Sequence, residues 1–505
     1  MYFNETDPGE VSKIISNLDI TKAGDLYGIT PKLIKCAPSI ASNLSIIFNL
    51  CIEQGIFPHQ LKVAKVIPVY KADSKMLASN YRPISLLPII GKIFEKIIFN
   101  RLSDFITKYK ILYNKQYGFQ AGKSTEHALI DIQQNILNAL ERREHPCCVF
   151  LDFAKAFDTV NHSILLQKLN HYGIRGNTLN LIESYLTDRE QCVQVNNTLS
   201  DLDKISHGVP QGSILGPLFF LLYINDIANC SPLLTFYLFA DDTTIFLSHK
   251  CLKTLEKTLN EELIKVSHWL IANKLSLNVK KSNTLLFRTK SESNTSKINL
   301  KLDGVPIDEK RTTKYLGVIL DHKLIYADHI KQVKSKLIKG NVILAKVRHY
   351  IPHNLLANTY NAHIQPHIDY GQNIWGHAAN VHLEDIVRQQ KKSVRIINFK
   401  NKHHETTPLF KQSKILPVDC NRKFNSGKLL WKINNSLCPS LNSLFTKRQH
   451  DDSFHVPHRR LDVSQNSITY DSVKTWNAIP SEIRSCSSIN LFKTKYKEHL
   501  LKKLI

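Results

Sequence analysis

The sequence predicts an α+β fold whose C-terminal part is mainly helical. Three observations support this prediction: short apolar or β-branched runs alternate with helical patterns through the middle of the chain, amphipathic helices fill the first sixty residues, and basic helical patterns dominate from about residue 323 onward. At 505 residues, 43% of them hydrophobic, the chain is long enough to bury more than one core. We therefore expect several domains or one large, multi-lobed enzyme.

The first sixty residues carry two helical patterns. Apolar residues recur three and four positions apart in "DPGEVSKIISNLDI" and in "SIASNLSIIFNLCIEQG". Gly55 can end the second helix, because glycine adopts the left-handed backbone conformation without steric cost. A β-rich run, "VAKVIPVYKA", follows, and "NYRPISLLPIIGKIFEKIIFNRLSDFI" predicts a turn that leads into an amphipathic helix.

The middle of the chain alternates predicted strands and helices. "HPCCVFLDF" is typical of a short buried strand, and two helical patterns follow it, the first ended by Gly173. The loop "GVPQGSILGP" precedes the apolar segment "LFFLLYINDIA", and Pro217 suits the first turn of that helix. A long helix comes next, with an apolar stripe formed by Leu252, Leu255, Leu259, Leu263, Val266 and Leu270.

The charge balance is strongly basic. The formal net charge is +24 and the isoelectric point is near 9.5. This excess favours a polyanionic partner such as nucleic acid. A solvated basic surface is the alternative, since the lysines of segments such as "HIKQVKSKLIKGNVILAKVRHYI" can simply cover the wet face of helices that bury leucine and isoleucine.

The sequence supports neither a membrane-spanning protein nor a protein stabilised by disulfides. No uncharged apolar run reaches 18 residues, and "MYFNETDPGEVSKII" lacks the basic and apolar regions of a signal peptide. Ten cysteines are scattered without a C-x-x-C pair, which argues against a zinc ribbon and for reduced thiols. We expect an intracellular protein, nuclear and/or cytoplasmic, with no membrane partner.

Three carboxylates follow or interrupt predicted strands. In "YLFADDTTIFLS", Asp241 and Asp242 lie at the tip of a predicted strand pair, where a tight hairpin would prefer Asn-Gly or Asp-Gly. Neighbouring anions repel one another unless a cation lies between them. Asp152 ends the apolar strand of "CCVFLDF" and can join the pair if the two strands are neighbours.

Such a trio predicts a metal site. Oxygen-rich sites suit Mg²⁺, which keeps positions for water and substrate phosphates. Two ions about 4 Å apart could activate a primer hydroxyl and stabilise a leaving pyrophosphate. The expected chemistry is nucleotidyl transfer.

A series of motifs carries a family resemblance. In order they are "NYRPISLLPIIGKIFEKI", "QYGFQAGKST", "FLDFAKAFDTV", "HGVPQGSILGPLFFLLYINDI", "FADD", "LSLNVKKSNTLLF" and "KYLGVILD". This series resembles the reverse transcriptases of non-LTR (LINE-type) retrotransposons, and most closely the jockey-like elements of animals. The resemblance runs from about Glu10 to about Ile397, and "VKTWNAIPSEIRSCSSINLFK" is similar to the C-terminal segment of that family.

The resemblance implies a right-hand polymerase with fingers, an antiparallel palm sheet and a mainly helical thumb. It divides the chain into an N-terminal helical extension (1–60), fingers and palm (61–321), a thumb-like basic region (322–400) and a C-terminal region of retrotransposon type (401–505). The implied partners are an RNA template, a DNA primer or target DNA, and deoxynucleoside triphosphates. The sequence identifies no protein partner.

The resemblance also implies a metal and sugar site. Asp152 and Asp241 would ligate two Mg²⁺ ions, with Mn²⁺ as a substitute, and Asp242 would be a nearby carboxylate. The carbonyl of Phe153 would complete the coordination of the nucleotide's metal. Phe157 holds the position where an aromatic ring blocks a 2′-hydroxyl and so excludes ribonucleotides by steric clash. The alternative for Phe157 is core packing.

Other implied roles concern the nucleotide and the template. Lys71 and Arg82 resemble the residues of the fingers that hold the triphosphate, where permanent charge and a planar guanidinium are useful. Gln211 and Gly212 lie in a loop that resembles the segment beneath the templating base pair. Lys281 would donate a proton to the leaving pyrophosphate, although the adjacent Lys280 leaves that assignment open.

"KYLGVILD" resembles the hairpin that holds the primer. The basic helices after it suit a thumb that follows the sugar-phosphate backbone by charge and shape.

The sequence departs from the family in several places. The printed sequence leaves no room for an endonuclease domain ahead of the polymerase, so we expect a truncated copy that does not nick its own target by the usual route. Gln120 and Lys123 stand where arginines are frequent, and Ser282 replaces a commoner threonine. Two alternatives stay open: a catalytically inactive or host-adopted nucleic-acid-binding remnant, and an intron maturase.

Overall fold

The protein gathers segments that are distant in sequence into compact units. The computed structural model describes residues 1–71, 73–290, 292, 297–449 and 452–504. Within them, unit 1 combines Met1–Phe119, Leu151–Thr243 and Glu262–Lys281, whereas unit 2 combines Gln120–Phe150, Thr244–Glu261 and Ser282–Ile505. This division differs in kind from the four consecutive segments inferred from the sequence, which stay a prediction.

Unit 1 opens with the predicted N-terminal helices. They are α1 (Pro8–Ser16), α2 (Pro31–Lys35) and α3 (Ile40–Gln54). The side chain of Asp7 caps α1 by accepting a hydrogen bond from the Glu10 N–H at 3.0 Å. Gly55 ends α3 with φ of 67°, which confirms the predicted left-handed stop.

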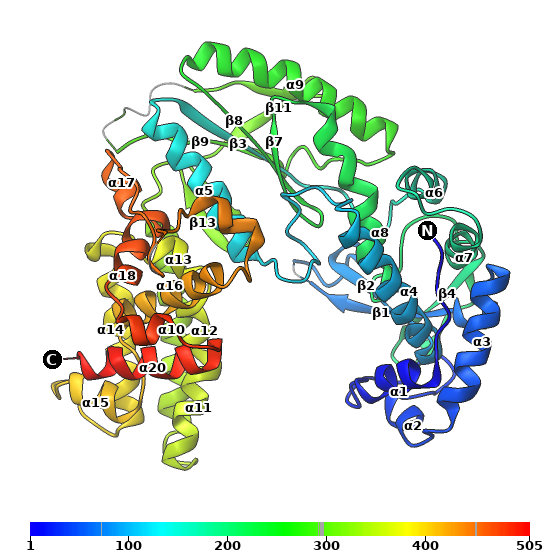
Figure 1. Ribbon diagram of the computed structural model, residues 1–505, viewed down its shortest axis with the longest axis horizontal. Coiled ribbons are helices and arrows are strands. Elements are labelled where there is room, and N and C mark those ends of the chain that lie inside the picture. The colour runs from blue at the N-terminus through cyan, green and yellow to red at the C-terminus, as the bar shows by residue number, and fades with distance from the viewer. Residues whose placement is uncertain (72, 291, 293–296, 450–451, 505) are drawn as a thin grey trace. The chain divides into compact units, whose positions relative to one another are not determined.

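A small sheet in unit 1 carries the basic hairpin. β1 (Ala64–Tyr70) pairs antiparallel with β2 (Tyr81–Leu86) and parallel with β4 (Arg189–Val195). In Figure 1 these strands lie beside α4 (Ile89–Lys108) and α8 (Leu215–Ile224). The other elements of unit 1 are η1 (His59–Leu61), η2 (Ala78–Asn80), α6 (His162–His171), α7 (Asn177–Leu186), β5 (Thr198–Leu199), β6 (Asp203–Ile205), η3 (Asn225–Cys230) and β7 (Thr235–Phe239).

A second sheet contains the strands that flank the predicted carboxylates. Its order includes β10 (Leu300–Leu302), β11 (Val305–Glu309), β9 (Asn283–Leu286), β3 (His145–Leu151) and β8 (Asp242–His249). β3 and β9 are antiparallel, as predicted for the palm, and β11 joins β9 in the parallel direction.

α9 (Leu252–Ala272) follows β8 and matches the predicted long helix. Leu255, Leu259, Leu263 and Val266 of its apolar stripe are fully buried, and Leu270 is 3% exposed.

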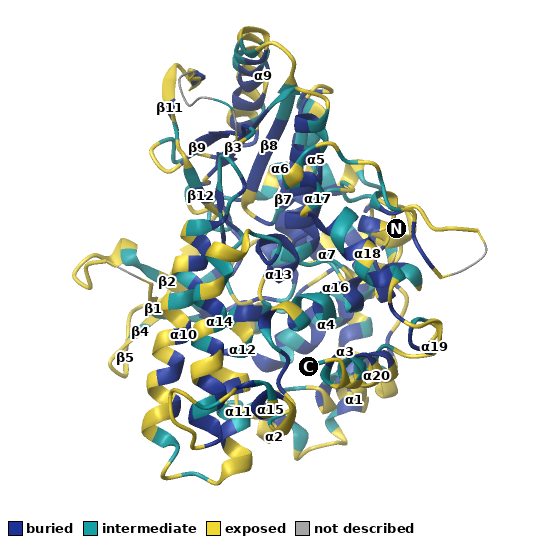
Figure 2. Cartoon of the chain, turned by 90° about the vertical axis from the view of Figure 1, so that its left-hand side faces the viewer, coloured by how far each residue is buried: buried dark blue, intermediate teal, exposed yellow. Residues whose placement is uncertain are grey.

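The C-terminal part of unit 2 is mainly helical, as predicted. Figure 2 shows α10 and α14 with buried residues on one side and exposed residues on the other, which is typical of packed amphipathic helices. The helices are α10 (Ala327–Val347), α11 (His353–His363), α12 (Gln365–Asp369), α13 (Gln372–Trp375), α14 (Asn380–Ile397), α15 (Thr407–Gln412), α16 (Val418–Asn434), η4 (Pro439–Leu444), α17 (Asp462–Gln465), η5 (Ile468–Ser472), α18 (Val473–Asn477), α19 (Ser481–Arg484) and α20 (Ile489–Lys502). Among the described residues, no helix is both long enough and apolar enough to cross a membrane.

The "KYLGVILD" segment forms a tight hairpin. β12 (Thr312–Tyr315) pairs antiparallel with β13 (Val318–Asp321), with Tyr315 opposite Val318. The two loop residues, Leu316 and Gly317, both have positive φ, at 43° and 82°. Positive φ at both positions is the signature of a type I′ turn, which matches the twist of paired strands.

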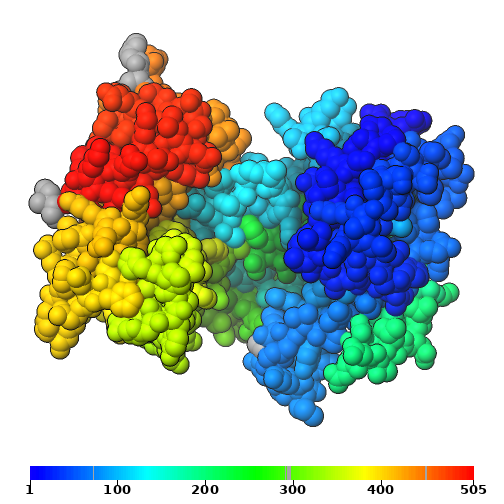
Figure 3. Space-filling view, turned by 90° about the horizontal axis from the view of Figure 1, so that it is seen from below, coloured from blue at the N-terminus to red at the C-terminus, as the bar shows by residue number. Residues whose placement is uncertain are grey.

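One buried helix of unit 2 anchors the end of the chain. α5 (Thr125–Glu141) receives a hydrogen bond from the Thr469 hydroxyl to Gln134 Oε1 at 2.7 Å, and the Leu461 N–H donates to Glu141 Oε1 at 2.9 Å. Figure 3 shows the orange to red C-terminal segment packed against the yellow segment of the same unit, and α16 and α20 are in contact. The C-terminal region is therefore an integral part of unit 2.

Candidate active site

The predicted carboxylate pair lies where β7 meets β8. The loop residues are Ala240 and Asp241, and Asp242 is the first residue of β8, so the tip of the hairpin lies one residue earlier than predicted. Ala240 has φ of 55°, whereas Asp241 does not have positive φ. Positive φ at only the first loop position is the pattern of a type II′ turn, which prefers glycine there. A left-handed alanine costs about 1–3 kcal/mol, so neighbouring contacts must hold this turn.

Gln116 and Gly118 supply those contacts. Gln116 is 1% exposed, and its Oε1 accepts hydrogen bonds from the Ala240 N–H at 3.2 Å and the Gly118 N–H at 2.9 Å. The Tyr117 N–H donates to the Leu238 carbonyl at 2.7 Å, which aligns this segment with β7. A Cβ on Gly118 would lie 2.5 Å from the Ala240 nitrogen. Gln116 and Gly118 thus brace the carboxylate turn, a role that was not assigned from the sequence although both residues lie in the "QYGFQAGKST" motif.

Asp152 follows β3, the neighbour of β8 in the sheet order. Its carbonyl accepts a hydrogen bond from the Asn278 N–H at 2.8 Å, and Phe153 forms an antiparallel bridge with Leu277. The Lys281 N–H donates to the Asn278 carbonyl at 3.0 Å. The turn that ends at Lys281 is therefore anchored to the backbone of Asp152.

The predicted charged residues lie close enough to shift one another's pKa values. The surrounding protein atoms displace water and raise the pKa of Asp241, the charge of Asp152 raises it further, and Arg82 and Lys71 oppose the rise. Desolvation, followed by the charges of Asp241 and Asp152, raises the pKa of Asp242 to about 6. Both aspartates have surface accessible to solvent. The three carboxylates lie close enough to repel one another, and a bound cation would offset this repulsion.

The β1–β2 hairpin presents Lys71 and Arg82 from one face. Arg82 pairs with Val69, and the Lys71 N–H donates to the Asn80 carbonyl at 2.9 Å. Residues two apart on a strand share a face, and paired residues also share a face. Both cations therefore project from the same side of the hairpin, and both act on the Asp241 carboxylate.

Phe157 lies in an aromatic stack. Its ring stacks on Phe220 with centroids 4.6 Å apart and meets Phe119 edge-on at 6.4 Å. Phe220 is fully buried, Phe119 is 57% exposed, and Phe157 itself is half-buried. Phe157 accordingly packs on the core and keeps an accessible part. Its role as a sugar gate stays a prediction.

The "GVPQG" loop is tied to the Phe157 turn and to β2. Gln211 Nε2 donates to Asp158 Oδ1 at 2.8 Å, and the Ser85 N–H donates to the Gln211 carbonyl at 2.8 Å. Gly212 has φ of 127°, and a Cβ there would lie 2.5 Å from the Ser85 carbonyl oxygen. Gln211 therefore uses an amide N–H to hold Asp158, and its contact with a nucleotide or template base stays a prediction.

A buried acid supports the same loop. Glu95 Oε2 accepts the Ile214 N–H at 2.6 Å and Oε1 accepts the Tyr185 hydroxyl at 2.9 Å. Burial raises the pKa of Glu95 even though these hydrogen bonds and the nearby Arg189 oppose the rise. Glu95 was not singled out from the sequence, although a lone acid within the apolar segment "GKIFEKII" was a usable signal.

The carboxylates fit a divalent cation whose remaining coordination positions are filled by substrate and water. Among the described residues, no group of three or more His, Cys, Asp or Glu side chains is arranged so that it could hold a metal ion. Mg²⁺ is commonly held by one or two carboxylates together with phosphates and waters, so an incomplete cage is expected. The mutual repulsion of Asp152, Asp241 and Asp242 is the feature that a cation would relieve.

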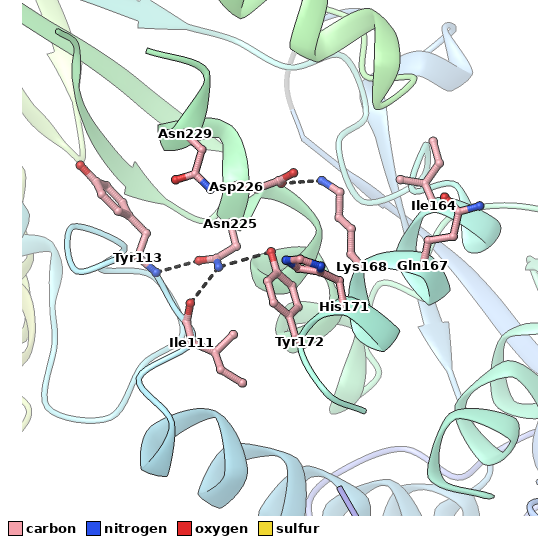
Figure 4. A pocket seen from close by; sticks show the side chains of 10 residues that line it. All are labelled: Ile111, Tyr113, Ile164, Gln167, Lys168, His171, Tyr172, Asn225, Asp226 and Asn229. Atoms are coloured by element: carbon pink, nitrogen blue, oxygen red, sulfur yellow. Dashed lines mark hydrogen bonds and ion pairs between the residues drawn. The ribbon is translucent and has the colours of Figure 1, made fainter. Parts of the chain in front are cut away.

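A separate pocket of unit 1 shares no residue with the predicted site. It has a volume of about 520 Å³, and Figure 4 shows Lys168 bonded to Asp226, and Asn225 bonded to Tyr172 and to the backbone of Ile111 and Tyr113. Lys168 Nζ donates to Asp226 Oδ1 at 2.5 Å, and Asn225 accepts the Tyr113 N–H at 2.7 Å and donates to the Ile111 carbonyl at 2.9 Å. These internal bonds indicate a structural network.

The comparisons with known proteins identify the class. The family model "Reverse transcriptase (RNA-dependent DNA polymerase)" matches residues 69–320, a range that contains every residue of the predicted site. The chain belongs to the reverse transcriptase family, whose polymerases have the right-hand fold and use divalent metal ions.

Curated relatives narrow the class to mobile elements of the non-LTR type. The chain is 29% identical over 402 residues to "Probable RNA-directed DNA polymerase from transposon X-element" of Drosophila melanogaster, covering 77% of this chain and 44% of that protein. It is equally identical to "RNA-directed DNA polymerase from mobile element jockey" of the same species, covering 77% and 43%. The chain thus spans less than half the length of these relatives.

Among solved structures, the telomerase of Candida albicans in complex with a fragment of telomeric RNA aligns with a TM-score of 0.37 and 12% identity, covering 70% of this chain and 63% of that chain. This likeness is too weak to assign a fold.

Proposed function

We propose that this protein is the RNA-directed DNA polymerase of a non-LTR retrotransposon, adding deoxynucleotides to a DNA 3′-hydroxyl on an RNA template. The observation that carries the proposal is the convergence of Asp152, Asp241 and Asp242 with the cations of the β1–β2 hairpin, Lys71 and Arg82, within one unit. Three anions opposite two cations can hold metal ions on one side of a triphosphate and neutralise its charge on the other.

Each residue then has a distinct task. Asp152 and Asp241, together with the Phe153 carbonyl, would hold two Mg²⁺ ions, with Mn²⁺ as a substitute. Bound cations would lower the pKa of the primer hydroxyl and offset the charge on the phosphates. Arg82 and Lys71 would orient the triphosphate.

The remaining residues select the substrate and complete the reaction. Phe157 would exclude a 2′-hydroxyl, and the Gln211–Gly212 loop would support the template base pair. Lys281, which lies in the turn anchored to Asp152, would protonate the leaving pyrophosphate. The partners are an RNA template, a DNA primer or target DNA, and deoxynucleoside triphosphates. All ten cysteines are free thiols, in keeping with action inside the cell, in the nucleus or cytoplasm.

The test is primer extension on a polyribonucleotide template with an oligodeoxynucleotide primer and Mg²⁺. The unaltered protein is expected to make DNA, and Asp241→Asn is expected to bind template-primer without extending it. Asp201→Asn, an exposed loop residue of the same unit, is the matched control and should retain activity. An unaltered protein that binds but makes no product would favour the binding remnant, and assisted RNA splicing without synthesis would favour the maturase.

A further inference from the structure

A lysine-lined cavity lies within unit 2. It has a volume of about 580 Å³ and is bordered by the start of α5, by α16 and by α20. Its cationic residues are Lys123, which precedes α5, Lys428 and Lys432 on α16, and Lys493 on α20. None of these lysines belongs to the predicted polymerase site.

The charges in this cavity act on one another. Burial lowers the pKa of Lys428, the charges of Asp369 and Glu126 oppose this decrease, and the charges of Lys493 and Lys432 add to it. Burial, then the charges of Lys432 and Lys123, lowers the pKa of His127 to about 4. Lys428 and Lys432 are also four residues apart on one helix, where like charges destabilise. Folding therefore brings cations together at an energetic cost that an anion would relieve.

The two acids of the cavity are engaged by neutral amides. Asp369 Oδ1 accepts hydrogen bonds from Gln365 at 2.9 Å, Asn421 at 2.7 Å and Asn425 at 3.0 Å. Glu126 Oε1 accepts one from Asn373 at 2.8 Å, and burial raises the pKa of Glu126. These acids attract Lys428, but four lysines outnumber two carboxylates. The cavity keeps a net positive charge.

We propose that this cavity binds a phosphate group. The recognised chemistry is a compact, multiply charged oxyanion held by lysine ammonium groups, which donate hydrogen bonds as point charges. The source is either a phosphodiester of bound nucleic acid or a free anion such as pyrophosphate. The nucleic-acid source rests on the proposed function, whereas the free-anion source does not. The cavity gives the C-terminal region a direct role in holding a ligand.

The test uses the full chain and two double variants that each remove the same amount of charge. Lys428→Gln/Lys432→Gln alters the cavity, and Lys495→Gln/Lys502→Gln alters exposed lysines of α20 outside the cavity lining. Fluorescence anisotropy measures the affinity for a labelled RNA/DNA template-primer between roughly 50 and 200 mM salt, the range in which phosphate binding responds to ionic strength. A thermal-shift titration with sodium pyrophosphate measures free-anion binding.

A phosphodiester source predicts that the cavity variant binds template-primer about tenfold more weakly, with a salt slope reduced by roughly 0.7–0.9 for each phosphate that the variant no longer neutralises. A free-anion source predicts that pyrophosphate stabilises the unaltered protein and the control but not the cavity variant. The charge-preserving Lys428→Arg/Lys432→Arg variant should retain either behaviour.

Identical behaviour of the cavity and control variants in both assays would overturn the inference. If the glutamine double variant fails to fold, Lys493→Gln decides by the same two measurements. Neither assay contains deoxynucleotides, so failure of the unaltered protein to synthesise DNA would refute the proposed function and leave this inference standing.

Discussion

Gly118→Ala is expected to lower the rate of catalysis in a protein that still folds, because the new Cβ would press on the carboxylate turn. The Cβ would lie 2.5 Å from the Ala240 nitrogen, and ordinary contact begins at 3.4 Å, so the backbone must yield by the difference of 0.9 Å. A misplacement of about 1 Å at a catalytic group costs roughly 100-fold in rate. The strain itself should cost about 1–3 kcal/mol of stability. The expected result is a turnover about 100-fold lower in single-turnover primer extension, with unchanged affinity for template-primer.

Gly427→Ala is the matched control for this variant. It is the same chemical change, and its Cβ would lie 2.6 Å from Cε1 of Tyr496, a side-chain atom in unit 2. It should lower the melting temperature and leave turnover within a few-fold of the unaltered protein. A folded Gly118→Ala variant with normal turnover would refute the reasoning that Gly118 positions the turn.

Three further predictions concern the sugar gate, the buried acid and the pH dependence of stability. Phe157→Val should raise ribonucleotide incorporation in primer extension, because a smaller side chain leaves room for a 2′-hydroxyl, and an unchanged deoxy/ribo ratio would return Phe157 to core packing. Glu95→Leu should lower the free energy of unfolding in urea by about 2–4 kcal/mol, since the Ile214 N–H and the Tyr185 hydroxyl lose their acceptor, and an unchanged denaturation midpoint would contradict this. Burial alone would raise the pKa of Asp471, but hydrogen bonds from His377 and Arg422 and the charge of Arg422 hold it well below its usual 3.8. The ionised carboxylate therefore stabilises the fold above about pH 4 and loses this contribution as the pH falls further. The difference in melting temperature between the unaltered protein and Asp471→Asn should shrink toward pH 3, and a difference independent of pH would contradict the assignment.

Helices with a regular spacing of apolar residues or a clear stop signal could be predicted from the sequence. The stripe of α9 and the stop of α3 at Gly55 match the structure, because apolar spacing and glycine conformation are local properties. α5 was not predicted. The signals for it were nevertheless present, because Leu129, Ile132, Ile136 and Leu140 recur at helical spacing and Ser124 caps the start of the helix.

The candidate site likewise contains residues that could be identified from the sequence and residues that could not. The carboxylates could be named from their residue types and their positions beside predicted strands, whereas Lys71 and Arg82 were named from the family resemblance. The brace by Gln116 and Gly118 could not be named, because it depends on the close approach of two backbones that are more than 100 residues apart. The bond of Gln211 to Asp158 likewise depends on loop packing that no local pattern encodes.

Because the C-terminal region packs against α5, this helix cannot complete its contacts on the ribosome until that region has been synthesised. Gln134 and its partner Thr469 are separated by 335 residues. At roughly 5–20 residues per second, synthesis leaves α5 without this partner for roughly 20 to 70 seconds. During that interval the nascent chain presents the apolar residues of α5 without the later segments that cover them, so this helix is where chaperones would be expected to bind and where slowed translation would promote aggregation.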